Sequence, residues 1–548
     1  MARLHFGLTR MSIVPLIPIL ILLGGALGAA ASRLVRLKYP DAIGAVASLA
    51  ALLALLSLIN LPPGETLISN WQPLSVFGTP ISLRVERLDW FIGLVTVLIC
   101  AAISFAGLAY PGRRRFDIAA AGMGMTATVI AAAFASNLLT LVLAWGVFDV
   151  VYIIAALTQG REQDSVRRAA FIVGLNGAAT LCVGIAALAL SQANESRYWH
   201  LTHLTETAQM WLMAAAVLRL GLYPINQWLV FDRNDTPGRA AVLYVLPSLL
   251  GLQLLIRLAT LDALPQASPL SWLAAFSLGA GGIMAWWRGR SRDALPYLAL
   301  SGLGAVVLAG ALSDSQAAVL ISGAASWALA ITTLSIGRGF DRRAPWWSIG
   351  NVLAIATLIG LPATLGFAVR TYLSAGGVAR ADWLLIALAL LGETLMFAAL
   401  ARSVLSPADD EAPAGWPAKV AGVIGMALAA LPPFVLPAIA RGIVPEITPP
   451  AFEIVLAKLG APGGLLIGLP IVFAAILAGR ARETKSAPII DPSRVAGLDW
   501  LYALMYWLID LAARMLRGAA SLLEGEGALL WALLIVIAAY VVWSGAIP

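Results

Sequence analysis

Charged residues, cysteines and histidines are scarce in this chain. Only 12% of its 548 residues are Asp, Glu, Lys or Arg, whereas 60% are hydrophobic; soluble domains carry about 25% charged residues. Cys100 and Cys182 are the two cysteines, and both lie in apolar stretches without an iron–sulfur, haem or zinc motif. Three histidines make a metal-rich redox centre unexpected. We therefore expect an integral membrane protein with no cofactor or metal of its own, and any electron transfer would occur in other chains.

Apolar runs of about 20 residues recur along the whole chain, each long enough to cross ~30 Å of hydrocarbon. We predict an all-α polytopic membrane protein with about 16 spans, at 11–31, 42–61, 89–110, 118–136, 138–158, 169–190, 209–230, 241–261, 270–287, 295–312, 317–336, 347–375, 383–402, 418–440, 462–479 and 527–546. The run 347–375 is too long for one straight helix. Gly360, Pro362 and Gly366 suggest two half-helices separated by a break.

Basic residues in the loops predict an orientation. Clusters of arginine and lysine follow every odd-numbered span among the first eleven, whereas the loops near 137, 262–269 and 313–316 contain none. The alternation places the clusters in the cytoplasm and both chain termini outside, although Arg3 and Arg10 argue mildly against it. The net charge of +7 comes from these loops and does not argue for nucleic acid. We expect the bacterial inner membrane and its lipid bilayer as the location.

The segment between the last two predicted spans has a different pattern. A polar linker near 483–493 is followed by leucines and methionines at helical spacing, flanked by Trp500 and Trp507, with Asp510 and Arg514 among them. This pattern is typical of an amphipathic helix, about 496–520, lying on the cytoplasmic membrane surface. A helix packed under the bundle fits the same pattern equally well.

Arg219 is the most informative charge, because it lies in the apolar stretch 209–230, five residues before Pro224. A charge at the centre of a membrane helix costs roughly 2.5–3.5 kcal/mol on insertion scales, and proline removes backbone hydrogen bonds and bends the helix. The pair points to an ion path or a conformational joint inside the bilayer.

Few other ionisable or strongly polar side chains lie within the predicted spans. Asp149 can be a proton-accepting carboxylate or a neutral acid hydrogen-bonded to a neighbour. Arg370 and Glu393 can likewise be functional or structural, and Arg257 and Arg402, near helix ends, are expected to snorkel. The further polar candidates on a path are Asn176 and Asn226.

A short internal echo suggests a repeat. Gly221-Leu-Tyr-Pro224 resembles Gly360-Leu-Pro362, each in an interrupted hydrophobic run. Interrupted helices at matching places in two halves are typical of inverted-repeat transporters with an intramembrane site. We expect two inverted five-helix repeats, at about 118–261 and 270–405.

Several segments, in one order, resemble the antiporter-like membrane subunits of respiratory complex I and of Mrp-type cation/proton antiporters. The resemblance covers roughly residues 80–405, and its strongest piece is Leu218–Leu229 (LRLGLYPINQWL), followed by Pro237. The other pieces are Leu88-Asp89, Asn137–Trp145, Ala169–Thr180 with Asn176 at the family asparagine, Asp293–Tyr297, and Gly360–Arg370. The resemblance implies a core at 81–405, an N-terminal two-helix segment at 1–80 and C-terminal spans at 406–548.

The departures from the family pattern concern its titratable residues. The fifth-helix glutamate position is Gly146, with Asp149 three residues later, and the seventh-helix lysine is Arg219. Arg370 replaces the twelfth-helix lysine or glutamate and Asn226 a histidine, while the other relay positions fall at Leu249, Gly302 and Leu329. Arginine is effectively always protonated in proteins, so it can bias a proton path but is a poor carrier. Conduction would then need water, with Asp149 and Glu393 as titrating stations.

The resemblance implies a proton-translocating, or cation/proton antiport, membrane subunit of a complex I-like NADH-quinone oxidoreductase assembly. Other membrane subunits would be its partners, and protons or monovalent cations its cargo. Asp149 and Arg219 would form the switch pair of a first half-channel, and Arg370 would serve a second. The alternative is a non-conducting scaffold, or an ion-driven partner subunit, of an inorganic-carbon uptake or hydrogenase-type complex, because fold resemblance does not fix function.

Overall fold

The computed structural model describes residues 14–32, 40–60, 64–69, 71, 78–109, 118–157, 163–225, 238, 241–264, 269–288, 291–337, 345–380, 382–405, 416–443 and 466–479, and single positions between 504 and 518. The chain divides into two compact units, Met1–Pro488 and Ile489–Pro548. Asn226 and the expected span 527–546 lie outside the described residues.

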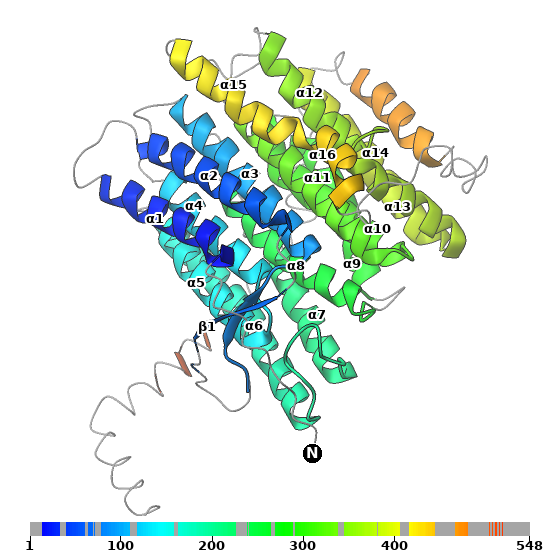
Figure 1. Ribbon diagram of the computed structural model, residues 1–548. Helices are drawn as coiled ribbons and strands as arrows, with labels where there is room; N and C mark the ends of the chain where they lie inside the picture. Colours follow the sequence, from blue (N-terminus) through cyan, green and yellow to red (C-terminus); the bar gives the residue numbers. More distant parts are fainter. Residues whose placement is uncertain are drawn as a thin grey trace, which may run out of the picture. The chain divides into compact units, whose positions relative to one another are not determined.

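The first unit is a bundle of helices (Figure 1). Its longer helices are α1 (Ile17–Ser32), α2 (Pro40–Ser57), α3 (Arg87–Leu108), α4 (Ile118–Ala133), α5 (Leu138–Leu157), α6 (Gln163–Gln192), α7 (Glu206–Leu220), α8 (Leu246–Thr260), α9 (Pro269–Arg288), α10 (Ser291–Leu312), α11 (Gln316–Gly337), α12 (Pro345–Ile359), α13 (Gly366–Arg380), α14 (Trp383–Leu405), α15 (Trp416–Ala430), α16 (Pro432–Ile443) and an unlabelled helix, Leu466–Gly479. A π-helical turn, η4 (Ala241–Val245), leads into α8.

Within the described part of the chain, nine helices are long and apolar enough to cross a membrane. The protein is therefore a mostly helical integral membrane protein. The expected single span 418–440 is two helices, α15 and α16, bent by 44° at a break, and counting them as one span gives ten. Pro432 and Pro433 follow the break and lack the backbone N–H groups that would continue the α15 hydrogen-bond ladder.

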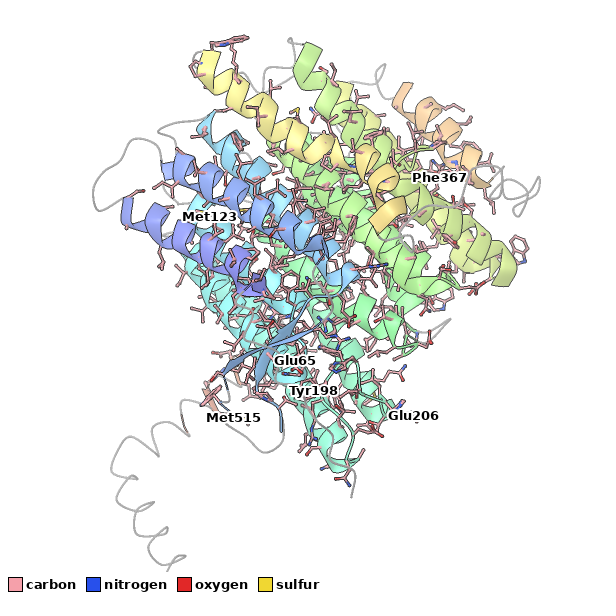
Figure 2. All side chains as sticks on the ribbon, viewed as in Figure 1. Glu65, Met123, Tyr198, Glu206, Phe367 and Met515 are labelled. Atoms are coloured by element: carbon pink, nitrogen blue, oxygen red, sulfur yellow. The ribbon has the colours of Figure 1, made fainter. Side chains whose placement is uncertain are left out.

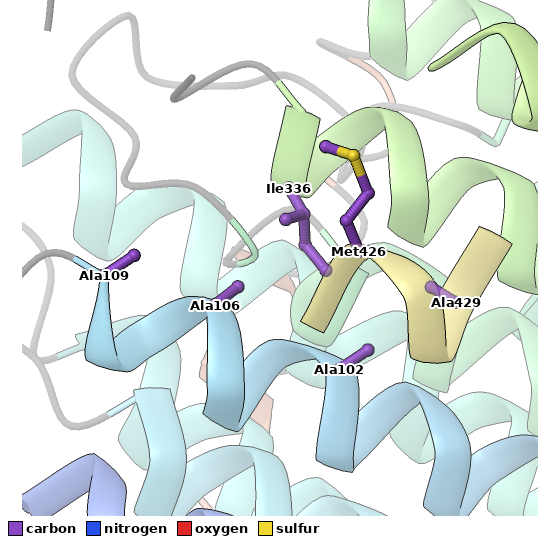
Figure 3. Packing of buried hydrophobic residues seen from close by; sticks show 6 residues of the cluster. All are labelled: Ala102, Ala106, Ala109, Ile336, Met426 and Ala429. Carbon is purple, nitrogen blue, oxygen red and sulfur yellow. The ribbon is translucent and has the colours of Figure 1, made fainter. Parts of the chain in front are cut away.

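Helix α11 is the centre of the packing, and its whole apolar window is buried. It carries no charged residue, and its hydroxyls bond to carbonyls of their own helix, as Thr332 does to Ala328 at 2.7 Å and Thr333 to Leu329 at 2.8 Å. Small residues then let neighbouring helices approach. Figure 3 shows one such contact, where Ala102, Ala106 and Ala109 of α3 pack with Ile336 of α11 and with Met426 and Ala429 of α15.

A two-stranded antiparallel sheet was not anticipated by the all-helical prediction. Strand β1 (Glu65–Ser69) pairs with β2 (Ile81–Arg84) in the loop between α2 and α3. The Asn137 amide, at the start of α5, donates to Pro80 O at 2.9 Å and to Ser82 Oγ at 3.0 Å, and so ties the sheet to the α4–α5 turn. These hydrogen bonds hold the sheet and the α4–α5 turn together at one end of the bundle.

The α6–α7 loop lies at the same end, since Asn137 forms a β-bridge with Tyr198. Figure 2 shows Glu65 and Tyr198 near each other there. Burial, and then the negative charge of Glu65, raise the pKa of Tyr198 to about 12. Burial, and then the positive charge of Arg84, lower the pKa of His200, whose ring lies edge-on to Tyr198 at 5.7 Å.

In the second unit the described positions between Leu504 and Gly518 are helical. Leu504, Trp507 and Met515 are exposed, and Arg514 forms an ion pair with Asp510 at 2.5 Å, one turn apart. These positions fall within the amphipathic helix expected at about 496–520.

Candidate functional site

Arg219 forms a two-pronged ion pair with Asp149 in the interior of the bundle. The Arg219 Nη1 lies 2.5 Å from Asp149 Oδ1, and Nη2 lies 2.9 Å from Oδ2. The Arg219 side chain is fully buried, while 14% of the Asp149 side chain is exposed. Asp149 is in the middle of α5 and Arg219 in the last turn of α7, so the pair joins two helices well away from their connecting loops. Fork-to-fork contact is the strongest arginine–carboxylate geometry.

Aromatic and hydroxyl groups complete this first site. The Trp145 ring centroid lies 4.4 Å from the Arg219 guanidinium carbon, and the Phe148 ring lies 5.7 Å away. The Thr180 hydroxyl of α6 is 3.5 Å from Asp149 Oδ2 and 3.4 Å from Arg219 Nη2. Among the described residues the Nε of Arg219 has no hydrogen-bond partner. The charge is therefore neutralised by Asp149 and covered by rings, not by water-facing groups.

The helix ends directly after Arg219. Gly221 caps α7 with φ +67°, a left-handed conformation that glycine adopts without steric cost. The freed backbone groups find side chains of neighbouring helices: Ser248 donates to Leu220 O at 3.2 Å, and the Tyr223 N–H donates to Ser277 Oγ at 2.9 Å. Pro224 follows, in a cis peptide bond with Tyr223. Arg219 thus also faces the negative end of the α7 dipole.

A second buried arginine, Arg370, lies beside the break between α12 and α13. Helix α12 ends at Ile359, Gly360 has φ +71°, and α13 begins at Gly366. Arg370 Nη1 donates to the Ile359 carbonyl at 2.7 Å, and Nη2 donates to the Ile467 carbonyl of the last described helix in this unit. The Phe397 ring lies 5.1 Å from its guanidinium carbon. Here backbone carbonyls, not a carboxylate, hold the cation.

Glu393 is the acidic residue that interacts with Arg370 at this second site, but the two side chains do not form an ion pair. It lies on α14 one turn before Phe397, is 5% exposed, and interacts with Arg370 only through longer-range charge. No described side chain hydrogen-bonds to its carboxylate. Instead it lines a cavity of about 20 Å³ together with Ser374 and Leu466, and such a volume holds roughly one water molecule.

Arg257 lies in the last turn of α8 and contacts groups from three other segments. Its Nη2 lies 3.5 Å from Asp89 Oδ1 and donates to the Ala133 carbonyl, and its guanidinium carbon lies 5.1 Å from the Trp199 ring. It therefore joins α8 to α3, to the end of α4 and to the α6–α7 loop. Arg402 near the other end of the bundle donates to the Trp286 carbonyl at 3.3 Å.

The remaining candidates have smaller roles in this geometry. Asn176 is buried one turn before Thr180, and its carbonyl accepts the Thr180 hydroxyl at 3.1 Å. Trp145 and Thr180 were missed as site residues. Their spacing could have indicated them, because Trp145 precedes Asp149 by four residues and Thr180 follows Asn176 by four, which in a helix places each pair on one face.

No protein-family model matches the chain. Among curated proteins it is 26% identical over 213 residues to NADH-quinone oxidoreductase subunit N of Desulforudis audaxviator, a match to 34% of this chain and 42% of that protein. It is 27% identical over 214 residues to the Rhodopseudomonas palustris subunit N, covering 36% and 47%. The matched part thus spans less than half of these two relatives. With subunit 14 of the Thermus thermophilus enzyme it shares 28% identity over 408 residues, covering 67% of this chain and 90% of the relative.

Solved structures share its fold. A chain of the Mrp complex from Dietzia sp. superposes with a TM-score of 0.70 at 20% identity, covering 97% of this chain and 63% of that one. A chain of the archaeal membrane-bound sulfane sulfur reductase gives 0.66 at 18% identity, covering 96% and 100%. A chain of Thermus thermophilus respiratory complex I with bound NADH gives 0.63 at 20% identity, covering 81% and 100%. All three are multi-subunit membrane complexes.

Proposed function

Because this chain belongs to the family of antiporter-like membrane subunits, we propose that it translocates protons, or exchanges a cation for protons, as a membrane subunit of a complex I-like assembly. Its partners are then other membrane subunits, with the redox chemistry in separate chains. We place it in the bacterial inner membrane with both termini outside, in agreement with the loop charges.

The Asp149–Arg219 contact is the observation that carries this proposal. Arg219 keeps its charge, so the group that can change is the Asp149 carboxylate, which is partly exposed whereas Arg219 is not. A proton arriving on Asp149 cancels the partner charge of a fully buried arginine, and an unpaired buried charge is unstable by several kcal/mol. Protonation of Asp149 therefore drives Arg219 away from it. The break at Gly221 provides a place where the end of α7 can move.

Arg370 and Glu393 belong to a second half-channel in this proposal. Glu393 faces a water-sized cavity, so water can deliver a proton to its carboxylate. Arg370 lies at the helix break on carbonyl ligands, where its charge attracts or releases the Glu393 carboxylate without itself carrying a proton. Asn176 at the first site, and Asn226 beyond the described residues, are proposed to hold water.

The second candidate function is a non-conducting scaffold. It is favoured by the middle of the bundle, where Leu249 and Leu329 are 2% and 0% exposed and carry no titratable group. A chain that only anchors partners would keep the fold and the helix breaks but need no proton on Asp149.

Proton uptake by proteoliposomes containing the intact complex separates the two functions. Under an imposed potential or pH gradient, the wild type should take up protons. Asp149→Asn keeps the size of the side chain and much of the hydrogen bonding but cannot be ionised, and should reduce the flux at least tenfold. Thr202→Val, a loop substitution, is a control with unchanged flux. Equal flux in wild type and Asp149→Asn would rule out Asp149 as the proton-accepting group, and no flux in either protein would support the scaffold.

A further inference from the structure

The two charged sites are separated by helices α8 and α11, which contain few titratable side chains. Helix α8 packs on α7 on one side and on α11 on the other, and α11 packs on α12 and α13. Helix α11 carries no Asp, Glu, Lys, Arg or His, and α8 carries only Arg257, which lies in its last turn at the end of the bundle and bonds to the Ala133 carbonyl. Among the described residues, a route between Arg219 and Arg370 that runs through α8 and α11 therefore passes a layer with no titratable group in its middle.

Trp327 of α11 occupies the space beside Gly302 of α10. A Cβ added to Gly302 would lie 2.9 Å from Cδ1 and 3.4 Å from Nε1 of the indole, and 3.6 Å from Cδ2 of Leu358 in α12. Trp327 is 2% exposed. Position 302 thus has room only for hydrogen because the indole lies against the α10 backbone. The bulky indole of Trp327 thus packs against Gly302, which has only a hydrogen there, at the junction of α10, α11 and α12.

The indole offers no free hydrogen-bonding group to a water molecule. Its only polar atom, Nε1, donates to the Ala299 carbonyl of α10 at 2.8 Å. A buried water needs two to four polar partners, and the hydroxyls of the sequence neighbours Ser301 and Ser326 already donate to the Leu278 and Gly323 carbonyls, each at 2.9 Å. The contact therefore excludes water both by filling the volume and by using the available polar atoms.

We propose that Trp327, seated on Gly302 at the junction of α10, α11 and α12, is a dry seal that closes the route through α11 between the Asp149–Arg219 site and the Arg370–Glu393 site. Trp327 then determines which openings the ions or protons of each site can use. Each site exchanges ions or protons only through its own openings, and neither passes them to the other along the membrane plane. The seal does not depend on whether either site conducts.

The first test measures water access directly. In a Cys100→Ala/Cys182→Ala background, Ala299→Cys places a thiol on the residue whose carbonyl accepts the indole N–H. A small membrane-permeant methanethiosulfonate reagent labels thiols as thiolates, which form where water reaches. With Trp327 intact we expect labelling at least a hundredfold slower than at the exposed loop position Leu201→Cys. Labelling within tenfold of that reference would overturn the proposal, and this comparison needs no substitution of Trp327.

The second test removes the seal. Trp327→Asn should raise labelling of Ala299→Cys at least tenfold, because it leaves space and a polar group. Trp90→Asn is the matched control, since Trp90 is also buried (4% exposed) and its indole also donates to a backbone carbonyl, Leu55 O at 2.8 Å. It should not change the labelling. Unchanged labelling in Trp327→Asn, or an equal rise in Trp90→Asn, would show that Trp327 is not what keeps water out.

The separation of the two sites has its own readout. In proteoliposomes under a potassium diffusion potential, Trp327→Asn should increase passive proton entry severalfold over the wild type. Adding Asp149→Asn or Glu393→Gln should return it to the wild-type level, because the new route runs between the sites. No increase in a protein whose wild-type flux depends on Asp149, or an increase that persists in both double variants, would contradict the separation. Failure of the proposed function would appear differently, as a wild-type flux insensitive to Asp149→Asn while labelling still depends on Trp327.

Discussion

The guanidinium of Arg219 meets the carboxylate of Asp149 fork to fork, with contacts of 2.5 and 2.9 Å across two helices. The two residues are 70 positions apart in sequence and are each other's only charged partner among the described residues of the site. The fold and the proposed activity therefore both depend on one contact, and it can be tested through either.

Removing one member of the pair should cost more than removing both. Asp149→Asn and Arg219→Gln are each expected to lower the free energy of unfolding in detergent by about 3–5 kcal/mol when the remaining charge stays buried. The double variant should lose less than the sum of the two, by at least about 1 kcal/mol. Chemical unfolding of all four proteins measures the coupling. Strict additivity would mean that the contact contributes nothing beyond the separate side chains.

The Trp145 ring should stabilise the Arg219 charge. Trp145→Phe keeps a ring near the guanidinium and should change stability little, whereas Trp145→Leu loses the ring and about 2 kcal/mol of the desolvated cation–π interaction in addition to packing. The difference between the two variants should shrink when Arg219 is already replaced by Gln. Thermal unfolding of the two variants in both backgrounds gives the answer, and an equal difference in both would assign the effect of Trp145 to packing alone.

Gly360→Ala should disturb the second helix break. Gly360 has a positive φ of 71°, and an added Cβ would lie 2.8 Å from the Gly366 carbonyl oxygen and 3.1 Å from Arg370 Cβ. We expect a loss of at least about 1–2 kcal/mol from the left-handed backbone alone. Gly184→Ala is the control, because nothing lies within 4 Å of its added Cβ. In that helix interior alanine should be neutral or stabilising by up to about 1 kcal/mol.

Arg257 should matter more than its partner Asp89. Arg257→Ala leaves the Ala133 carbonyl without its donor and uncovers Trp199, which should cost about 1–3 kcal/mol. Asp89→Asn weakens the longer 3.5 Å contact but keeps an oxygen that can accept the hydrogen bond from the Glu86 backbone, so it should cost about 1 kcal/mol or less. Hydrogen exchange should accelerate in the α6–α7 loop around Trp199 in Arg257→Ala and change little in Asp89→Asn. The reverse order would contradict the assigned contacts.

The α6–α7 loop should loosen in mild acid. Burial and Arg84 lower the pKa of His200 in the folded loop, so below about pH 6.5, the ordinary value, the open loop binds more protons than the closed one. Linkage then makes the closed loop less stable as the pH falls and more stable as it rises. Hydrogen exchange of the Tyr198–Leu201 segment between pH 5 and 8 should show this trend, and His200→Gln should remove it. A trend that persists in His200→Gln would point to another group.

The sequence pattern predicts the helical membrane fold, and the resemblance to antiporter-like subunits groups Asp149 with Arg219. Long apolar runs are a strong local signal, and rare intramembrane charges need partners. The sheet formed by β1 and β2 was not predicted, because its strands are only five and four residues long and its stability comes from Asn137 and Ser82, far away in sequence. The same holds for Arg257, whose partners Asp89, Ala133 and Trp199 come from three different segments.

The sequence likewise did not predict that the arginines of the two sites have different kinds of partner. Arg370 and Glu393 could be read as a second ion pair, yet Arg370 turns to the carbonyls of Ile359 and Ile467 while Glu393 faces a cavity. Which acceptor an arginine reaches depends on the direction in which a helix restarts after a break. That direction is set by packing between helices, not by the residues at the break.

The position of the two partners along the chain has a consequence for how the protein is made. Helix α5, with Asp149, is long and apolar enough to cross a membrane, whereas α7, with Arg219, has only 15 helical residues. Asp149 is synthesised 70 residues before Arg219 and awaits it in the bilayer. Because an unpaired charge is costly in hydrocarbon, a carboxylate already present on α5 lowers the cost of inserting Arg219. The ion pair would act first in biogenesis, before it acts in any transport.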